Sequence, residues 1–408
     1  MKLNFLFIAL VYILPFCAYA DDVVNVNGRV TDVKTKQPLP GAVVTIHELR
    51  RTAVTDAEGN FTFRSLPSRG RFIVDVHYIG YKNVSMTFDV ASQQPLNFEL
   101  QPSAIEAQEV VITGSAVSSD NKRNSTSVSV MSHEDLLAHP STNIIDAISR
   151  IPGVSQITTG PSISKPVIRG LSYNRIVTLN NGVKQQGQQW GDEHGIEIDQ
   201  YSADRVEVLR GAASLLYGSD ALGGAINILE PLPVPDGEIR GEVLSNYSFN
   251  NGLTASSAML TGNENGFVWL GRGTYKNAYA FKTPTGYFPN SGFNECDFNG
   301  MIGLNKSWGY SHLNFSYFKN NIGFYEGEQD AVGNWLNEDG AEYTNSQLKD
   351  RTLMQPRQDI RHYKIALNNN FFIGDGNLKL DIGYQQNQRR ELEDGPVPSL
   401  FFDLGTFS

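Results

Sequence analysis

A strict two-residue alternation of apolar and polar side chains in the C-terminal half most constrains what this chain can fold into. It is clearest in residues 378–385, in which Leu378, Leu380, Ile382 and Tyr384 alternate with Lys379, Asp381, Gly383 and Gln385. Successive side chains on a strand point to opposite faces, so each such segment predicts a strand with one apolar and one polar face. Strands of about ten residues with this pattern suit a barrel wall between lipid and lumen. A soluble antiparallel sheet has the same alternation and remains the alternative.

The connections between these segments favour the membrane wall. Short links follow the second, fourth and sixth predicted strands, whereas the long links 277–298 and 321–360 follow the third and fifth. Alternating short turns and long loops are typical of outer-membrane barrels. After the first 20 residues, no segment approaches the roughly 20 consecutive apolar residues of a spanning helix, so the chain would enter a membrane as strands. The seven predicted strands are 240–250, 254–261, 266–276, 299–307, 311–320, 361–373 and 377–389.

The N-terminus predicts export. Lys2 precedes a mostly apolar run that ends at Phe16, and Ala18-Tyr19-Ala20 supplies a small-x-small cleavage site, so residues 1–20 are predicted to be a signal peptide. Cleavage would leave Cys296 as the single cysteine, which excludes an internal disulfide. The formal net charge of −10 argues against nucleic acid as a partner.

Residues 21–101 predict a small β-sandwich. Short alternating segments are separated by turns rich in Pro and Gly, of which Gln37–Gly41 and Asp56–Asn60 are the clearest. So many short strands in so short a segment suit an Ig-like sandwich. The predicted strands are 25–31, 42–46, 53–55, 60–63, 72–78, 84–89 and 96–100.

Three strings in this segment, Gly28–Asp32, Pro40–Val44 and Thr55–Phe61, resemble the carboxypeptidase-regulatory-like domain found ahead of many Bacteroidetes outer-membrane receptors. The resemblance implies a spacer or docking module. His47 and Glu48 are adjacent and no second His stands at a metal-ligand spacing, so peptidase chemistry is not expected. Because neighbours on a strand point to opposite faces, we expect this pair to be solvated surface.

We predict that residues 102–117 form a linker and that residues 118–230 form an α+β domain. Ser141 is predicted to cap a helix that continues to Arg150 and has its isoleucines on one face. Asn180-Asn181-Gly182 predicts a hairpin turn. Strands are predicted at 167–170, 176–179, 205–211 and 225–229.

The string Arg205–Gly211, followed by Ser214–Ile228, resembles the plug-domain signature of TonB-dependent outer-membrane receptors. Ile168-Arg169-Gly170 and Asn181-Gly182 match further landmarks of that family in the right order. The resemblance covers residue 21 to at least residue 230 and implies a barrel of about 22 strands. Residues 231–408 would then be the start of that barrel, and we expect the chain to be an N-terminal fragment of a longer receptor.

The residues of the plug signature are expected to be structural. Its glycines allow tight backbone reversals, and their spacing fails the dinucleotide fingerprint, so they are not read as a phosphate cradle. Its charged residues are expected to face one another across plug strands and barrel wall, either as structural ion pairs or as pairs that weaken when TonB pulls. The signature comprises Arg169, Gly170, Arg205, Glu207, Arg210, Gly211, Tyr217, Gly218, Gly223 and Gly224.

A short β-prone segment precedes the plug and falls where the family keeps its TonB box, the segment that pairs with the energy-transducing protein TonB. Its residues are Glu109, Val110, Val111, Ile112 and Thr113. From its pattern alone, an exposed strand of this kind can pair through its edge with another protein. An ordinary first strand of the next domain is the alternative.

Two loops of the plug are candidates for ligand contact. The loop 184–196 combines a tryptophan with several amides, which suits an amphipathic ligand, and its acidic residues and histidine could approach a metal ion. A loop packed against the barrel, with its polar atoms satisfied locally, is the alternative, and no metal site is predicted. The candidate residues are Tyr173, Asn174, Arg175, Gln188, Trp190, Asp192, Glu193 and His194.

The sequence has no nucleophile–base motif, no HExxH and no P-loop, so neither a catalytic residue nor a cofactor is expected. The resemblance implies an outer-membrane active transporter that imports a metal chelate, such as a ferric siderophore or haem, into the periplasm. Its partners would be TonB with its inner-membrane energising complex, the ligand and outer-membrane lipid, and TonB would reach the plug from the periplasm. A glycan importer of the same superfamily and a surface receptor that binds or signals without transport are the alternatives.

Overall fold

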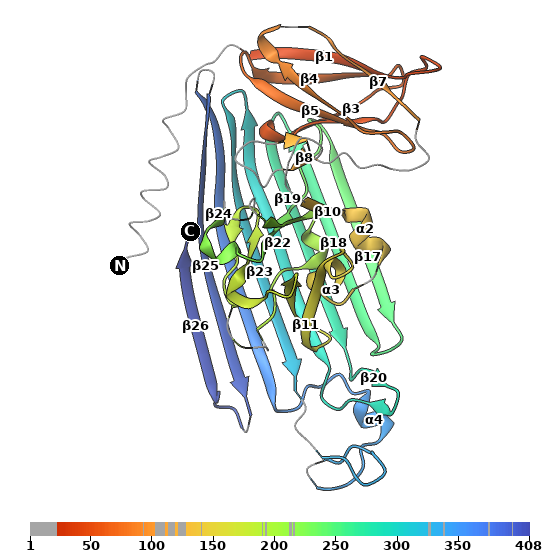
Figure 1. The fold of residues 1–408 in the computed structure, drawn as a ribbon, viewed down its shortest axis with the longest axis vertical. Helices are drawn as coiled ribbons and strands as arrows, with labels where there is room; N and C mark the ends of the chain where they lie inside the picture. The colour runs from red at the N-terminus through yellow and green to blue at the C-terminus, as the bar shows by residue number, and fades with distance from the viewer. Residues whose placement is uncertain are drawn as a thin grey trace. The chain divides into compact units, whose positions relative to one another are not determined.

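The computed structural model describes residues 23–408 except 93, 103–110, 113–118, 121–127, 140, 190, 192–193, 212–213, 215–216, 325–327, 338, 374–375 and 394. The predicted signal peptide therefore lies outside the described residues. The described chain is mainly β and contains the three predicted kinds of structure: a β-sandwich, an α+β plug and an open antiparallel sheet, which confirms the predicted fold class (Figure 1). It divides into two compact units, one around the sandwich and one around the plug and most of the long sheet.

The N-terminal domain consists of two sheets. One has the order β4-β1-β7, and the other has the order β3-β2-β5-β6. Strand β1 pairs antiparallel with β4 and parallel with β7. The strands are β1 (Val23–Asp32), β2 (Val43–Ile46), β3 (Arg51–Val54), β4 (Asn60–Pro67), β5 (Arg71–His77), β6 (Val84–Asp89) and β7 (Leu96–Leu100).

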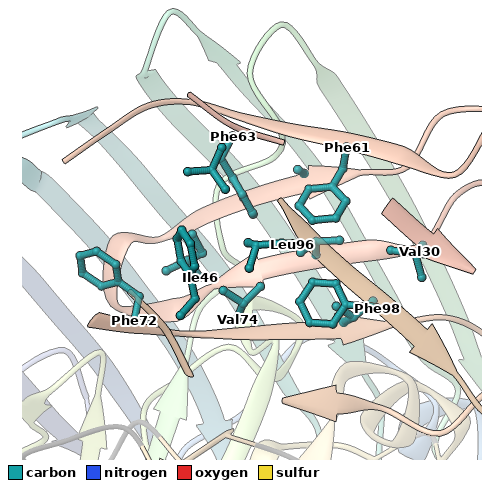
Figure 2. Close-up of a cluster of buried hydrophobic side chains, with 14 of the residues drawn as sticks. Val30, Ile46, Phe61, Phe63, Phe72, Val74, Leu96 and Phe98 are labelled. Carbon is teal, nitrogen blue, oxygen red and sulfur yellow. The ribbon is translucent and has the colours of Figure 1, made fainter. Parts of the chain in front are cut away.

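The core of the sandwich follows from the two-residue alternation of its strands. In β5 every second residue is buried, and the buried set of both sheets forms one apolar cluster. Figure 2 shows Phe61 and Phe98 together with Ile46 and Val74 in this cluster. Gly28 on β1 lets the strands approach closely, because an added Cβ there would lie 2.2 Å from both the carbonyl oxygen of Leu96 and the ring of Phe61.

The prediction that His47 and Glu48 form solvated strand surface is wrong. Both residues belong to a 3-10 turn, His47–Leu49, that directly follows β2. His47 Nε2 lies 3.0 Å from Asp75 Oδ2 on β5, and these side chains are only 11% and 17% exposed. Because the chain turns at this point, His47 and Glu48 no longer point to opposite faces of a strand, and the carboxylate of Asp75 on the adjacent strand contacts the imidazole of His47.

The plug is built on a five-stranded sheet of order β10-β15-β16-β13-β14, accompanied by a separate β11–β12 hairpin. Its apolar core includes Ile144, Ile148, Val206 and Ile226, which are all buried. The elements are β10 (Val128–Ser132), α2 (His133–Ala138), α3 (Ile144–Ile148), β11 (Val154–Gly160), β12 (Ile163–Ile168), β13 (Ile176–Asn180), β14 (Val183–Lys184), β15 (Arg205–Leu209) and β16 (Gly224–Leu229).

Two local predictions in the plug have different outcomes. The hairpin turn is confirmed. Asn181 and Gly182 connect β13 to β14 as a two-residue turn, and both have the positive φ that such a turn requires, 52° and 80°.

The prediction that Ser141 caps the helix is wrong, because α3 begins after Asn143, whose side chain accepts a 3.0 Å hydrogen bond from the backbone N–H of Asp146. The hydroxyl of Ser141 instead donates to the carbonyl of His139.

The long sheet contains eight antiparallel strands in sequence order. The seven predicted strands are all present, and an eighth, expected only as a beginning near the end of the chain, spans eight residues. The connections 265–266 and 307–308 lie at one end of the sheet, and the connections 279–292 and 324–356 lie at the other, here called the long-loop end (Figure 1). The strands are β17 (Ile239–Ser248), β18 (Leu253–Glu264), β19 (Phe267–Ala278), β22 (Phe293–Lys306), β23 (Gly309–Gly323), β24 (Arg357–Ile373), β25 (Gly376–Leu392) and β26 (Leu400–Phe407).

The two faces of this sheet have opposite character. Val243 is 82% exposed and Leu378 is 52% exposed on the apolar face, whereas Arg272 and Lys276 on the polar face are buried. The polar face is covered by the plug; for example, Thr274 Oγ1 on β19 donates to Asp199 Oδ2 of the plug over 2.7 Å.

Within the described residues, no helix has both the length and the apolar character needed to span a membrane.

Candidate functional site

A cavity of about 630 Å³ opens between the plug and the long sheet near the long-loop end. The plug contributes the tip of the β11–β12 hairpin and the start of α3. The sheet contributes the ends of β22 and β23 with the connection between β19 and β22. Its described lining is Thr142, Asp146, Gln156, Thr158, Thr159, Gly160, Pro161, Ser162, Ser164, Phe281, Phe288, Ser291, Phe293, Ile322, Gly323 and Phe324.

One side of the cavity is aromatic. The rings of Phe281 and Phe288 stack with centroids 5.4 Å apart, and Trp335 packs edge-on against Phe288 at 5.1 Å. Phe293 and Phe324 extend this wall. Aromatic faces of this kind bind large, partly apolar groups through dispersion and desolvation.

The opposite side is polar and is held in place by Asn143. While the oxygen of this side chain caps α3, its Nδ2 donates to the carbonyl of Pro161 over 3.2 Å and to Ser164 Oγ over 3.1 Å. The hydroxyl of Thr158 closes the hairpin tip by donating to the carbonyl of Gly160 over 2.6 Å. The tip is therefore a pre-formed surface of hydroxyl and backbone groups rather than a loose loop.

The cavity carries little charge. Among the described residues that line it, Asp146 is the only charged one, and its Oδ1 accepts a 3.0 Å hydrogen bond from Gln156. The arrangement suits reversible binding of an amphipathic molecule, and its described lining pairs no nucleophile with an adjacent base.

A second group of residues fastens the plug to the sheet. The carboxylate of Glu197 is 3% exposed and lies 2.8 Å from His362 Nδ1 on β24 and 3.0 Å from Arg389 Nη2 on β25. Asn387 on β25 also donates to it. We call Glu197, His362, Asn387 and Arg389 the carboxylate anchor.

The electrostatics of the anchor favour the charged carboxylate. Burial alone would raise the pKa of Glu197, but the hydrogen bond and charge of His362 and the charge of Arg389 outweigh it. The pKa of Glu197 therefore lies below its ordinary value. Arg389 is itself held by Gln358, whose Oε1 accepts from Nη1 over 2.6 Å.

Two further contacts join plug and sheet on the other side of the plug. His133 at the start of α2 lies 3.2 Å from Glu242 Oε2 on β17, and the other carboxylate oxygen of Glu242 accepts from Arg272 on β19 over 3.1 Å. On the same sheet Lys276 Nζ lies 2.6 Å from Glu295 Oε1 and 5.5 Å from the ring centroid of Tyr201 in the plug. The interface between plug and sheet is thus rich in charged and amide groups.

The residues of the plug signature interact within the plug. Arg205 Nε lies 3.3 Å from Glu207 Oε1 on the same strand, and Asn227 on β16 donates to the other oxygen of Glu207 over 3.3 Å. Burial and the charge of Glu207 raise the pKa of Tyr217 to about 12. These contacts support the structural interpretation of the signature, which remains a prediction.

The other charged signature residues lie at a neighbouring corner of the plug. Arg210 donates to the carbonyl of Pro152 over 2.7 Å and also to Ser129. Burial, followed by the positive charge of Arg169, lowers the pKa of Arg210. Gly224 has a φ of 151° and lies where a Cβ would come within 2.8 Å of the carbonyl of Leu209. Gly170, Gly211 and Gly218 also have positive φ. At Gly223 an added Cβ would lie 2.9 Å from Cβ of Leu171.

The predicted ligand-contact residues that the structure describes are not among the described residues that line the cavity. Gln188 is buried in the plug, where it accepts from Thr178 over 3.2 Å and donates to the carbonyl of Ile176 over 3.2 Å. His194 is also buried, with its ring 6.3 Å from that of Phe402 on β26. Trp190, Asp192 and Glu193 lie outside the described residues.

The second predicted contact segment, Tyr173–Arg175, forms a 3-10 turn. The turn includes Asn174. Lys165 Nζ lies over the ring of Tyr173, 4.4 Å from its centroid, in a cation–π contact. The carbonyl of Arg175 accepts a 2.7 Å hydrogen bond from the N–H of Gly223. Ligand contact at these residues remains a prediction.

The predicted TonB box is only partly described. Val111–Ile112 form the short strand β8, which pairs antiparallel with β9 (Ser119–Asp120). Glu109, Val110 and Thr113 lie outside the described residues. The pairing agrees with a β-prone segment, and its role as a partner strand remains a prediction.

Sequence reasoning did not identify the cavity or the carboxylate anchor. The turn Thr158-Thr159-Gly160-Pro161 and the phenylalanines at 281 and 288 were the available signals. They lie more than a hundred positions apart in the sequence, so neither implies the other. Glu197 lies in the loop that follows β14, whereas His362 and Arg389 lie on β24 and β25, and the three have no recognisable spacing.

Two family descriptions match the chain. Residues 120–225 match the TonB-dependent Receptor Plug Domain, and residues 26–112 match the CarboxypepD_reg-like domain. The two segments are consecutive and coincide with the plug and the sandwich of the structure. They agree with both resemblances stated from the sequence.

Two curated relatives match part of the chain. The chain is 35% identical over 127 residues to the iron-regulated outer membrane virulence protein of Vibrio cholerae, which covers 29% of this chain and 19% of that protein. It is 29% identical over 175 residues to the ferrichrome outer membrane transporter/phage receptor of Escherichia coli K12, which covers 41% of this chain and 23% of that protein.

Solved structures share the fold. The siderophore receptor PirA of Acinetobacter baumannii aligns with a TM-score of 0.51 at 20% identity, covering 69% of this chain and 43% of that chain. The pyoverdine outer membrane receptor FpvA of Pseudomonas aeruginosa PAO1 aligns with a TM-score of 0.54 at 16% identity, covering 69% and 40%.

The chain spans 19–23% of the length of these two curated relatives and 40–43% of these two solved chains. The relatives are outer-membrane proteins, which confirms the predicted location. Their family is one of transporters and receptors rather than of enzymes. The consecutive domain matches show that the chain carries a TonB-dependent receptor plug domain preceded by a carboxypeptidase-regulatory-like domain, and the structure places this plug against the polar face of an antiparallel sheet.

Proposed function

We propose that this chain belongs to an active transporter that imports a metal chelate across the outer membrane, with a ferric siderophore or haem as cargo. The cavity between the plug hairpin and the long sheet is the observation that carries the proposal. It lies at the long-loop end, which faces the cell exterior in outer-membrane barrels. The two curated relatives are named for iron regulation and for ferrichrome transport, which supports a chelate as the cargo.

The chemistry of the cavity suits a chelate rather than a bare ion. The stacked pair Phe281 and Phe288 would contact the apolar periphery of the ligand, while the hydroxyl and backbone groups at Thr158 would hydrogen-bond its polar edge. A chelate brings its own metal donors, so the protein has only to recognise the outer surface of the complex.

The plug–sheet interface suits a plug that must move. Its carboxylate anchor and its His133–Glu242–Arg272 contacts are polar, so water can replace them when the two surfaces separate. An apolar interface of the same size would offer no such replacement. In this proposal TonB pairs with residues 109–113 and pulls, and the anchor opens to release the ligand towards the periplasm.

Uptake of radiolabelled ferric chelates by cells that produce the full-length receptor tests the proposal. Phe288→Ala should weaken ligand binding about tenfold, because it removes one face of the aromatic wall. Phe315→Ala, on the lipid-facing side of β23, is the matched control and should leave binding unchanged. Equal binding by wild type and Phe288→Ala would refute the assignment of the cavity.

Energy coupling is tested separately. Deletion of residues 109–113 should abolish uptake while leaving binding of the same chelate at the cell surface intact. Collapse of the proton-motive force should have the same effect on the wild type. Unchanged uptake after the deletion would refute coupling through this segment, whatever the outcome for the cavity.

A further inference from the structure

A second pocket, of about 290 Å³, lies on the outside of the long sheet near the long-loop end. Strands β22, β23, β24 and β25 contribute its wall, and a segment of the connection between β23 and β24 covers it. It is separate from the ligand cavity, and the described residues that line the two pockets do not overlap. The residues that matter for its chemistry are Asn294, Asn321, Arg351, Arg357, Asp359 and Leu392.

The outward direction of these side chains follows from strand geometry. His362 on β24 and Arg389 on β25 contact the plug, so residues an odd number of positions away face outward. Arg357 and Asp359 on β24 and Leu392 on β25 meet this condition. The same rule places Asn321 outward, because its neighbour Asn320 donates to Ser162 of the plug over 3.0 Å.

The pocket has an excess of positive charge. Within the described part of the chain, Arg351 donates to uncharged oxygens, among them the carbonyl of Asn277 over 2.6 Å and that of Gly252 over 2.5 Å. The guanidinium of Arg357 has no hydrogen bond or ion pair with any described residue. Asp359 is the one acid in the described lining, and it is paired with Arg361 at 3.1 Å.

An aromatic and apolar surface continues from the pocket along the outside of the same strands. Tyr317 and Tyr363 pack with centroids 5.0 Å apart, and Phe298 and Phe315 follow with centroids 6.0 Å apart. Phe298, Phe315 and Ile365 are 46%, 40% and 45% exposed. This order of cations, then aromatic rings, then aliphatic side chains matches the passage from headgroups to hydrocarbon at a membrane surface.

We propose that this pocket binds the phosphate-bearing headgroup of a lipid in the outer leaflet. Arg357 would bind the phosphate through charge-assisted hydrogen bonds, and the amide of Asn321 would contact neighbouring headgroup oxygens. Arg351, whose guanidinium is held by Asn277, Gly252 and the ring of Tyr279, would add its positive charge to the site. The acyl chains would lie on the surface formed by Tyr317, Tyr363 and Phe315. That continuous surface favours a lipid over free phosphate, which would use the cations alone.

Native mass spectrometry of the full-length receptor, extracted from outer membranes in a mild detergent, tests the inference. The wild type should retain phosphorylated lipid, and Arg357→Gln should reduce the retained amount about fivefold, as expected for one arginine at an anionic headgroup. Arg390→Gln removes an equal charge from the outward side of β25, outside the pocket lining, and should have no effect. Because this site takes no part in chelate binding, its failure would leave the transport proposal standing.

Vesicles that contain phosphorylated lipid, added to delipidated receptor, should restore the lipid-bound species, whereas inorganic phosphate at the same phosphate concentration should neither bind nor compete. Equal loss of lipid in Arg357→Gln and Arg390→Gln would overturn the inference, because it would indicate a general effect of surface charge. Full competition by inorganic phosphate would also overturn it, because the site would then be one for a free anion.

Discussion

Replacement of Glu197 by Gln is the sharpest test of how the plug is held. The side chain keeps its shape but loses the charge that His362 and Arg389 face at 2.8 and 3.0 Å. Two charge-assisted hydrogen bonds are weakened, and Arg389 remains buried at 1% exposure, where the uncharged side chain of Gln358 still accepts from it. Charge-assisted bonds contribute about 1.5–3 kcal/mol each, so we expect the anchor to weaken by about 3 kcal/mol.

Hydrogen–deuterium exchange measures this loss directly. A decrease of about 3 kcal/mol in the free energy of local opening corresponds to about 150-fold faster exchange, since 1.36 kcal/mol is a factor of ten. The increase should be confined to the plug segment around residues 197–203. Glu207→Gln is the matched control, because its buried carboxylate pairs with Arg205 inside the plug and it should affect residues 205–209 instead. Unchanged exchange at 197–203 in Glu197→Gln would refute the anchor.

The pH dependence of the same signal follows from the lowered pKa of Glu197. Folding lowers the pKa of this carboxyl group, so its charge stabilises the folded state at any pH above the pKa of the unfolded chain. That stabilisation is lost as the pH falls through the lower pKa of the folded state. Protection at 197–203, corrected for intrinsic exchange, should therefore hold from neutral pH to the ordinary value of 4.5 and decrease only below it. Loss of protection between pH 7 and 5.5 would contradict this reading of the anchor.

Two further predictions concern stability. Gly28→Ala should lower the free energy of unfolding of the N-terminal sandwich by about 3 kcal/mol, because the added Cβ would lie 2.2 Å from the carbonyl oxygen of Leu96. Calorimetry measures this loss, and Gly271→Ala is the control, because nothing lies within 4 Å of a Cβ at that position. Equal melting temperatures of the two variants would contradict the prediction. Asn143→Ala should destabilise α3 by about 1 kcal/mol and speed exchange at the hairpin tip, since one side chain serves both, whereas Ser141→Ala should change exchange at neither place.

The strands of this chain could be predicted from the sequence because their evidence is local. Alternation along 377–389 and 311–320 fixes which residues face lipid, and the exposed fractions of Leu378 and Phe315 agree with it. The Asn181-Gly182 turn was predictable for the same reason, because only a few residue types adopt positive φ readily. In these cases a pattern of two to thirteen consecutive residues carries the information.

The helix cap and the His47 turn show where local evidence stops. Ser141 and Asn143 are both good caps, and the choice of Asn143 depends on Ser164, which lies on another element. His47 leaves strand geometry at the end of β2, where Asp75 of the neighbouring strand contacts it. Each result was decided by a partner distant in sequence, which a single sequence does not reveal.

The candidate site was less predictable than the fold for this reason. The cavity joins the hairpin tip at Thr158 to Phe288 and Phe293, and the anchor joins Glu197 to His362 and Arg389. Such groupings arise only when the plug is placed against the sheet. The plug signature was visible in the sequence because it is a contiguous string, and the structure shows its charges interacting within the plug.

The polar face of the long sheet has a consequence for the passage that appears once the plug moves. Arg272, Thr274, Lys276 and Asn314 lie under the plug, on the face of the wall that would surround the cargo. Because these groups bind water readily, the vacated space would fill with solvent as the plug withdraws, without the dewetting barrier of an apolar pore. A hydrated cargo could then diffuse along the wall without shedding its water, so the mechanical work would be spent on displacing the plug alone.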